Sequence, residues 1–230
     1  MSQTRLFSGI FYDFFGGFQV FPLVSILIPT SYRKPSEVIE KILEIIGDKT
    51  DICNSVVQCN KEAIRTQALE SDKKYRSKSA RMLEGVPFLV KEEITTEGYK
   101  MKFGLPEIVT PPFGKEYSKT NSLTVQRLID EGAICIGISN MHQIGLGISG
   151  LNQSSEHFGG ARNPYDLDVH TGGSSSGTAS GVASNLALFG LGTDGGGSIR
   201  IPAVNCGLVG IKPTFGRWST EKCVIFKKIG

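Results

Sequence analysis

Apolar side chains recur with a helical period in several stretches of the chain. Within residues 35–46 they lie three or four positions apart, Ser36 stands where a helix cap is expected and Gly47 follows the last of them. This pattern predicts a helix over residues 35–46. Residues 51–70 and 118–130 predict two more helices, the first capped by its initial aspartate and the second stopped by a glycine at position 132.

Short continuous apolar runs alternate with the predicted helices. The runs are residues 86–90, 133–138 and 186–191. Uninterrupted apolar character over so few residues is typical of buried strands. Between these runs, residues 140–147 and 174–185 predict further helices. The alternation of strand and helix indicates an α/β domain in which a sheet carries helices on both faces.

Composition bounds the class of protein. The chain has 230 residues, of which 40% are hydrophobic and 20% charged, which is ordinary for one soluble globular domain. A net charge of +3, with no basic run interleaved with aromatic residues, argues against nucleic-acid binding. The five cysteines have no zinc-type spacing and predict free thiols in a reducing compartment, hence a cytoplasmic protein.

The first 34 residues are rich in aromatic and apolar side chains. Their apolar stretch is interrupted by polar residues, glycine and proline, so neither a cleaved signal nor a spanning helix is predicted. Two interpretations stay open. The segment is a strap packed on the domain, which base rates favour, or a contact with the membrane surface, which suits a lipid substrate.

Two clusters of glycine and serine lie late in the chain, at residues 172–177 and 195–198. Glycine loses the most backbone freedom on folding, so such clusters indicate places where the backbone takes unusual angles or approaches another group closely. The serines beside the glycines suggest hydroxyl chemistry.

Two widespread patterns match these clusters, and the sequence argues against both. Residues 190–195 fit the dinucleotide fingerprint G-x-G-x-x-G, but residues 198–202 are a poor start for the helix that it must open, and no acidic residue lies near position 215. Residues 173–177 fit the nucleophile elbow, whose histidine follows its serine. No histidine follows His170. We therefore expect structural or surface roles for the three histidines, His142, His157 and His170.

A serine nucleophile without a histidine needs another base. Lysine is the chemical candidate, because burial lowers its pKa and leaves a neutral amine that accepts a proton. Lys91 directly follows the apolar run at residues 86–90, which is the environment for such a shift. The competing interpretation is a solvated surface lysine, the usual state of this residue type.

The chain carries separated motifs in a fixed order. They are GVPFLVK at 85–91, GGSSSG at 172–177, TDGGGSIRIP at 193–202 and GIKPT at 210–214. Together they resemble the amidase signature family over roughly residues 35–218. The TDGGGS variant is most similar to the fatty acid amide hydrolase branch, its plant-type enzymes especially. The resemblance implies a mixed β-sheet covered by helices on both faces.

The same resemblance implies a Ser–cis-Ser–Lys triad. Ser198 matches the nucleophile, Ser174 the bridging serine after a cis peptide bond, and Lys91 the general base. The two serines lie 24 positions apart, as in the family pattern. No metal or organic cofactor is required.

The glycines beside Ser198 fit an oxyanion hole, because backbone N–H groups without side chains let a substrate carbonyl come close. The predicted donors are Gly195, Gly196, Gly197 and Ser198. Four further residues are expected to support the site. Asp194 and Arg200 pair to hold the loop, whereas Ser175 and Thr193 hydrogen-bond the triad serines.

The sequence departs from the family in two places. Gln143 replaces a carboxylate that is frequent in relatives. Family members are also considerably longer, and residues 219–230 read as an unrelated tail, so a C-terminally truncated form with an incomplete sheet is predicted.

The resemblance implies hydrolysis of carboxamides, in this branch fatty acid amides, through an acyl-Ser198 intermediate. A glutamine-hydrolysing amidotransferase subunit is the alternative within the family. The alternative that is not an enzyme is an inactive fragment. The expected partner is a small amide substrate of lipid character. Peripheral membrane contact and a homodimer are further interactions that stay open.

Overall fold

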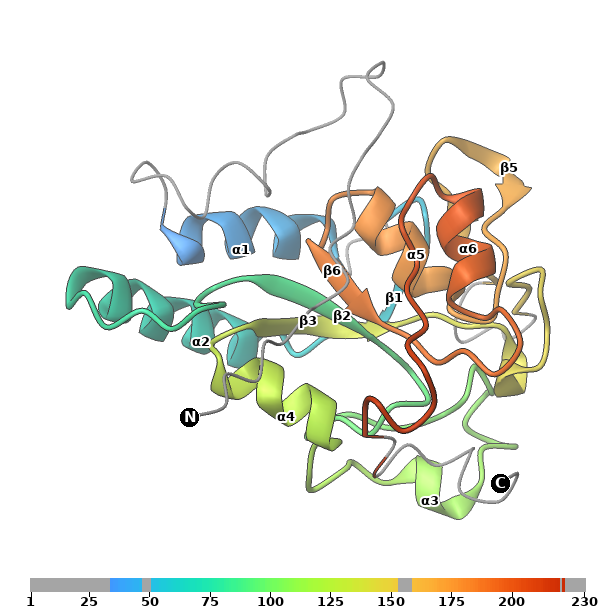
Figure 1. Ribbon diagram of the computed structural model, residues 1–230, viewed down its shortest axis with the longest axis horizontal. Helices are drawn as coiled ribbons and strands as arrows, with labels where there is room; N and C mark the ends of the chain where they lie inside the picture. The colour runs from blue at the N-terminus through green and yellow to red at the C-terminus, as the bar shows by residue number, and fades with distance from the viewer. Residues whose placement is uncertain (1–33, 47–50, 153–158, 220, 222–230) are drawn as a thin grey trace.

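A mixed sheet with the strand order β1-β3-β2-β6 organises the part of the chain that the structure describes (Figure 1). The structure is a computed structural model that describes residues 34–46, 51–152, 159–219 and 221. Strand β2 pairs in parallel with β3 and β6, and β1 runs antiparallel to β3. The strand bounds are β1 Val56–Gln58, β2 Pro87–Lys91, β3 Ile134–Ser139 and β6 Phe189–Leu191.

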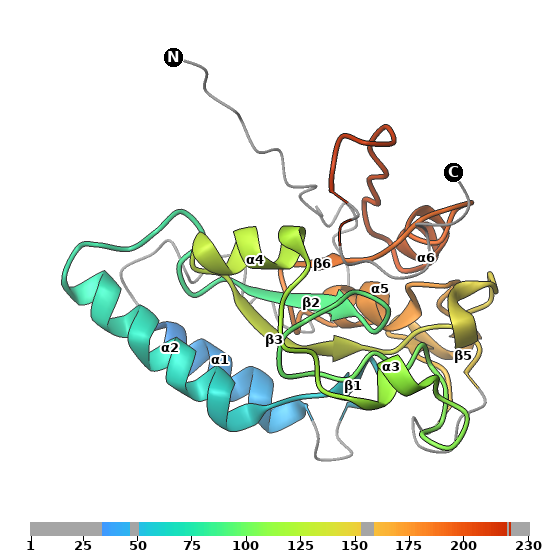
Figure 2. The same ribbon diagram turned by 90° about the horizontal axis from the view of Figure 1, so that it is seen from below.

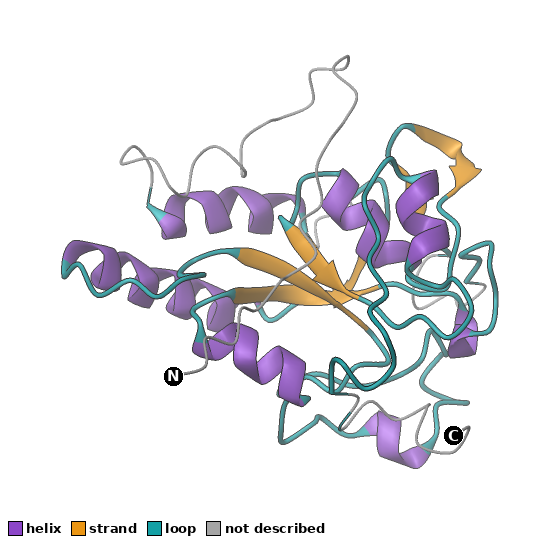
Figure 3. Ribbon diagram, in the orientation of Figure 1, coloured by secondary structure: helices purple, strands orange, loops and turns teal. Residues whose placement is uncertain are grey.

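Helices surround these strands (Figure 3). They are α1 Pro35–Ile45, α2 Lys61–Arg76, α3 Pro112–Lys115, α4 Leu123–Asp130, α5 Ser176–Ala183, α6 Arg200–Asn205 and the 3-10 turn η1 Gln143–Gly145. A separate antiparallel hairpin pairs β4 Arg162–Asn163 with β5 Asp166–His170. None of the described helices combines the length and the apolar character needed to cross a membrane.

The central strands β2 and β3 are buried over their whole length, because helices pack on both faces of the sheet. On one face, apolar side chains of α1, α2 and α5 form a cluster with Leu89 and Ile136. On the other face, α4 packs over Phe88 and Val90. Figures 1 and 2 show α4 on the opposite side of the sheet from α1. The prediction of a mixed sheet with helices on both faces is confirmed for the described residues.

The alternation of side chains along β2 decides where the lysine at its end points. Successive residues of a strand face opposite sides of the sheet. Phe88 and Val90 belong to the α4 cluster, and Leu89 to the cluster with α1 and α5. Lys91 therefore projects to the same face as Leu89, on the side where α5 lies.

The strongest apolar patterns predicted their elements correctly. The helix expected at residues 35–46 is α1, and the runs at 86–90 and 133–138 are β2 and β3. The helix expected at 118–130 begins later, at Leu123, since Ser122 accepts a hydrogen bond from the Val125 N–H at 3.5 Å and caps it. Within the segment 174–185 only the residues of α5 are helical. Within the run at 186–191 only the last three residues, which are β6, form a strand.

Residues 51–70 do not form the single helix that was predicted. β1 occupies part of this segment, and α2 starts at Lys61 behind Asn60, whose side chain accepts from the Ala63 N–H at 3.2 Å. Asp51 is no helix cap, because its carboxylate accepts from the N–H of Ser55 in a turn, at 2.8 Å. Ser36 does not cap α1 either, since its hydroxyl donates to Asp72 at 2.6 Å.

Besides β1, the sequence did not predict α3, the β4–β5 hairpin or α6. Helix α6 overturns one argument from the sequence, because residues 198–202 do lead into a helix. The helix expected at 140–147 is reduced to η1. The predictions for residues 1–33, His157 and nearly all of 219–230 lie outside the described residues.

The core under α1 generates a stability prediction. Leu43 is fully buried, whereas Leu69 on α2 is 54% exposed. Leu43→Ala is expected to lower the free energy of unfolding by about 2–5 kcal/mol, because it removes buried methyl groups and leaves a cavity. Leu69→Ala, the same change on a helix surface, is expected to cost less than about 0.5 kcal/mol. Urea denaturation of both variants tests this, and equal losses would contradict the described packing.

Candidate active site

The amino group of Lys91 lies at the centre of a buried polar cluster. Lys91 is fully buried at the end of β2. Its Nζ donates to Ser174 Oγ at 2.6 Å and to Thr193 Oγ1 at 2.9 Å. The Glu93 carboxylate lies 2.6 Å from the same nitrogen and is also buried. The solvated-surface interpretation of Lys91 is therefore wrong, and burial at the end of the apolar run is confirmed.

Helix α5 brings Ser174 to the lysine. Seven of its residues are buried, and they are small, so the helix lies close against the sheet. At Gly177 the helix backbone comes close to other backbone atoms: an added Cβ would lie 2.4 Å from the Ser55 carbonyl oxygen and 2.5 Å from the Asn140 nitrogen. Ser174 stands just before α5, and its peptide bond with Gly173 is cis, as expected.

Ser198 lies beside the start of α5. Its carbonyl oxygen accepts from the Ser175 N–H at 3.1 Å, which ties the two serine clusters together through their backbones. Ser198 is half-buried, and its hydroxyl has no hydrogen-bond partner among the described residues. The structure thus brings together the neighbourhoods of Lys91, Ser174 and Ser198, and leaves the Ser198 hydroxyl available.

The loop that carries Ser198 is held by a carboxylate. Asp194 accepts from the Gly197 N–H at 2.7 Å and the Ile199 N–H at 3.2 Å. It also pairs with Arg200, whose Nε and Nη2 donate at 2.9 and 3.0 Å. Burial alone would raise the pKa of Asp194, but these hydrogen bonds outweigh it and lower the pKa to about 2. The predicted Asp194–Arg200 pair is confirmed.

The N–H groups beside Ser198 divide into two sets. The Gly197 N–H is already bonded to Asp194, so it is not available for an oxyanion in this conformation, contrary to the prediction. Gly197 also has a φ of 132°, a region that favours glycine. The N–H groups of Gly195, Gly196 and Ser198 have no partner within the described part of the chain. Gly195 and Gly196 are exposed, so a bound group has access to them.

The prediction that Ser175 and Thr193 hydrogen-bond the triad serines holds for Ser175, through its backbone N–H, but not for Thr193. Thr193 does not bond a triad serine; its hydroxyl accepts from Lys91 and donates to Glu93. Ser175 contacts Ser198 through its backbone, and its hydroxyl donates to the Thr193 carbonyl at 3.4 Å. Thr193, which follows β6, lies with its hydroxyl against Lys91.

Glu93 is the site residue that sequence reasoning missed. After β2 the chain makes a turn, in which the Ile94 N–H donates to the Lys91 carbonyl at 2.9 Å. This turn brings the Glu93 side chain back to Lys91. The available signal was the pair of acidic residues that follows Lys91. Only the structure separates them, because Glu92 turns the other way and accepts from Gln58 and from the Gly104 N–H.

Opposing effects act on the pKa of Lys91. Burial is the largest and lowers the pKa; the negative charges of Glu93 and Asp194 raise it. The balance lies below the ordinary value. A lowered pKa makes the neutral amine, the form that accepts a proton, more accessible.

Of the histidines, His142 lies nearer the cluster than expected. Its backbone N–H donates to the Ser174 carbonyl at 3.0 Å. Burial, and then the charge of Lys91, lower the pKa of His142. His170 has the expected structural role: its Nδ1 accepts from the Gly172 N–H at 3.1 Å.

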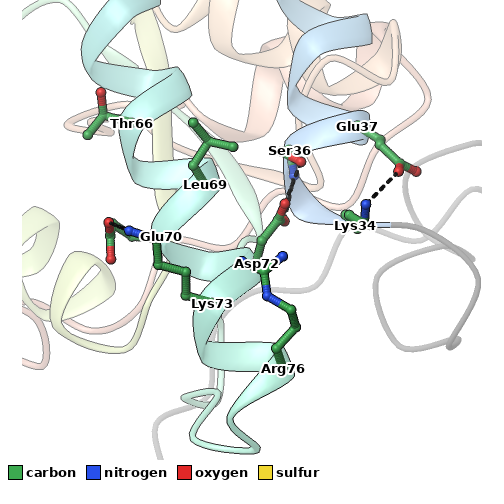
Figure 4. Close-up of a pocket in the computed structure, with 9 residues that line it drawn as sticks. All are labelled: Lys34, Ser36, Glu37, Thr66, Leu69, Glu70, Asp72, Lys73 and Arg76. Atoms are coloured by element: carbon green, nitrogen blue, oxygen red, sulfur yellow. Dashed lines mark hydrogen bonds and ion pairs between the residues drawn. The ribbon is translucent and has the colours of Figure 1, made fainter.

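Two other features of the described residues carry no comparable chemistry. No group of three or more His, Cys, Asp or Glu side chains among them is placed to hold a metal ion. A pocket of about 490 Å³ lies between α1 and α2 (Figure 4). Its polar side chains pair with one another, as Ser36 does with Asp72 and Lys34 with Glu37. None of the predicted site residues lines it.

Comparisons with known proteins find similarity to amidases. A family model described as Amidase matches residues 37–229. The chain is 35% identical over 192 residues to a glutamyl-tRNA(Gln) amidotransferase subunit of Thermoanaerobacter pseudethanolicus. The aligned residues are 83% of this chain and 37% of that protein. The chain is 38% identical over 188 residues to fatty acid amide hydrolase of Oryza sativa subsp. japonica, which covers 80% and 30%.

Solved structures show the same fold. The crystal structure of an amidase matches with a TM-score of 0.71 and 37% identity, covering 83% of this chain and 42% of the other. Native peptide amidase from Stenotrophomonas maltophilia matches with a TM-score of 0.73 and 30% identity, covering 83% and 39%. The chain spans about a third of the length of the curated relatives that it matches, 37% and 30% in these two cases.

The Asp194 loop generates a pH-dependent prediction. The folded-state pKa of about 2 lies below the ordinary 3.8, so its stabilisation is present above pH 3.8 and is lost as the pH falls towards 2. Since the Asp194 side chain is fully buried, Asp194→Asn is expected to lower the free energy of unfolding by about 2 kcal/mol at pH 7.

Urea denaturation between pH 7 and the acid range measures this effect. The gap between the parent chain and Asp194→Asn should close as the pH falls through that window. Asp168→Asn, at an exposed position on β5, is the matched control and should leave stability nearly unchanged. A gap that persists undiminished in acid would contradict the assignment.

Proposed function

Because this chain belongs to the amidase family, we propose that it is a serine amidase with Ser198 as nucleophile, Ser174 as proton relay and Lys91 as general base. The observation that carries the proposal is the contact of 2.6 Å between Lys91 Nζ and Ser174 Oγ in a buried site. A buried amine with a lowered pKa, in contact with a serine hydroxyl, is suited to general-base catalysis.

In the proposed reaction Ser198 Oγ attacks the amide carbonyl carbon. The Ser198 proton passes to Ser174 as the Ser174 proton passes to Lys91, so one proton leaves the nucleophile and one reaches the amine. The relay requires the Ser198 hydroxyl to donate to Ser174 Oγ when substrate is bound. The tie between Ser175 and Ser198 supports this by holding the two segments side by side.

The carbonyl oxygen becomes an oxyanion in the tetrahedral intermediate. The N–H groups of Gly195, Gly196 and Ser198 are the proposed donors, since Gly197 is engaged by Asp194. Collapse of the intermediate breaks the C–N bond, and the proton held by Lys91 returns through Ser174 to the departing amine. Water then releases the acid from acyl-Ser198 by the same route.

The proposed substrate is an amide with a long apolar acyl group. The segment after β3 exposes four apolar side chains, which are Ile144, Leu146, Ile148 and Leu151. This segment lies directly against Gly173, where an added Cβ would be 2.9 Å from the Gly147 carbonyl oxygen. An apolar surface therefore adjoins the bridging serine. The similarity to fatty acid amide hydrolase of Oryza sativa supports the same substrate class.

The second candidate is a glutamine-hydrolysing amidotransferase subunit. It is favoured by the similarity to the glutamyl-tRNA(Gln) amidotransferase subunits, which reaches 38% identity over 190 residues in Halorhodospira halophila. Both candidates use the same serine chemistry, so the substrate separates them.

Labelling with a fluorophosphonate probe tests the nucleophile. The full chain is expected to be labelled, and Ser198→Ala to abolish labelling, because the probe needs the serine oxygen. Lys91→Ala is expected to slow labelling by about 10² to 10⁴-fold, the usual worth of a general base. Ser79→Ala, at an exposed serine, should label like the parent. Labelling that survives in Ser198→Ala would refute the nucleophile.

Folding is checked on the same samples by circular dichroism. A chain that melts cooperatively and is not labelled would show that the site does not assemble in these 230 residues. That outcome would favour the inactive-fragment interpretation over both enzymatic candidates.

Hydrolysis of primary amides of increasing acyl length tests the substrate class. If the acyl chain binds the apolar segment, kcat/KM should rise about 4-fold for each buried methylene, since each contributes about 0.8 kcal/mol. Leu146→Ser, at a side chain that is 80% exposed, should weaken the dependence without changing the rate on acetamide. Release of ammonia from glutamine without any length dependence would favour the amidotransferase candidate.

A further inference from the structure

The amino group of Lys91 has three partners among the described residues, as many as an ammonium has N–H groups. Ser174 Oγ lies at 2.6 Å, Thr193 Oγ1 at 2.9 Å and Glu93 Oε1 at 2.6 Å. A lysine ammonium has three N–H donors and no acceptor. The neutral amine has two donors and one lone pair. Catalysis as a base depends on which partner faces that lone pair.

The hydrogen inventory of the cluster answers this question. Thr193 has one hydroxyl hydrogen, and it is donated to Glu93. Towards Lys91 the Thr193 oxygen is therefore an acceptor. An ionised Glu93 is also an acceptor only. Both groups require an N–H of Lys91, which leaves Ser174 as the partner that meets the lone pair.

We propose that Glu93 is a positioning residue for Lys91: its carboxylate, together with the Thr193 hydroxyl that it orients, takes the two N–H groups of the neutral amine and directs the lone pair at Ser174. This inference rests on the proposed function. It extends the relay by one group, so that the order becomes Glu93, Lys91, Ser174 and Ser198.

Glu93 also acts on the state that follows proton transfer. When Ser198 attacks, Lys91 gains one proton and becomes an ammonium. The carboxylate at 2.6 Å then faces a full positive charge between two buried side chains, where opposite charges attract more strongly than in water. When the proton returns to the departing amine, Lys91 and Glu93 are restored unchanged.

The other charged groups that face Lys91 do not replace Glu93. Asp194, in the loop after β6, is bound to Arg200 and to backbone N–H groups. The pKa of His142, after β3, is lowered by burial and by the charge of Lys91. Glu93 is the carboxylate in direct contact with the amine.

The adjacent Glu92 provides a matched control. It is buried like Glu93, but it accepts from the Gln58 side chain at 3.0 Å and the Gly104 N–H at 2.7 Å, away from the lysine. Glu92→Gln and Glu93→Gln are therefore the same change at neighbouring buried positions. Only Glu93→Gln removes a negative charge that contacts the amino group of Lys91.

The first readout is the pH profile of fluorophosphonate labelling. Labelling needs neutral Lys91, so its rate rises with pH through the pKa of that amine. Loss of a contacting negative charge lowers a lysine pKa, by about 1–3 units for a close pair. Glu93→Gln should move the rising limb to lower pH by this amount. Its plateau should also fall, by up to about 10⁴-fold, the effect of the orienting aspartate in a Ser-His-Asp triad.

Glu92→Gln should leave the position of the limb unchanged. Glu93→Asp retains the charge, so its limb should lie nearer to that of the parent than to that of Glu93→Gln. A lower plateau with an unmoved limb in Glu93→Gln would show a merely structural role and overturn the proposal.

The second readout does not need catalysis. The parent and Glu93→Gln chains, labelled with ¹³C-lysine, are titrated by NMR, and Lys91→Met identifies the Lys91 signal. The titration midpoint should be lower in Glu93→Gln, and identical midpoints would overturn the proposal. If the parent chain is not labelled by the probe, the proposed function fails, while this titration still decides whether Glu93 sets the state of Lys91.

Discussion

The described structure depends on the burial of one amino group. Taking a lysine out of water costs several kcal/mol unless partners replace the lost hydration. Lys91 finds them in Glu93, Ser174 and Thr193, which come from the turn after β2, the start of α5 and the end of β6. No single segment supplies the whole set. The cluster is therefore complete only when the parallel strands and α5 are assembled.

The same requirement explains why α5 is built from small residues. The helix must lie close enough to the sheet for Ser174 to reach the lysine, and Gly177 permits this, since any Cβ there would meet backbone atoms of the sheet side. Two of the buried hydroxyls of α5 are paired, whereas the Ser176 hydroxyl has no partner among the described residues. Thr178 bonds Ser139 of β3 at 2.6 Å, and Ser180 donates to the Arg162 carbonyl at 2.6 Å. Polar, close packing thus replaces the usual apolar helix face.

Sequence reasoning succeeded where a pattern is local. The apolar runs predicted β2 and β3, and the motif residues Lys91, Ser174 and Ser198 fall in one region of the structure. It failed where tertiary contacts decide. β1 is only three residues long and depends on pairing with β3. Helix α6 begins at the segment that Asp194 organises through its backbone contacts. Glu93 was missed because a turn, and not a periodicity, sets its direction.

Two carboxylates near the serines have separate tasks, and their surroundings explain the division. Asp194 accepts mainly from backbone N–H groups and from the half-exposed Arg200, so its charge stabilises the conformation of the loop before α6. Glu93 accepts from a lysine and a threonine in a buried site, so its charge acts on the amine that faces Ser174. Asp194 holds the loop in which Ser198 and its N–H neighbours lie. In the proposed relay Glu93 directs the amine of Lys91 at Ser174, and the backbone hydrogen bond between Ser175 and Ser198 joins the two parts.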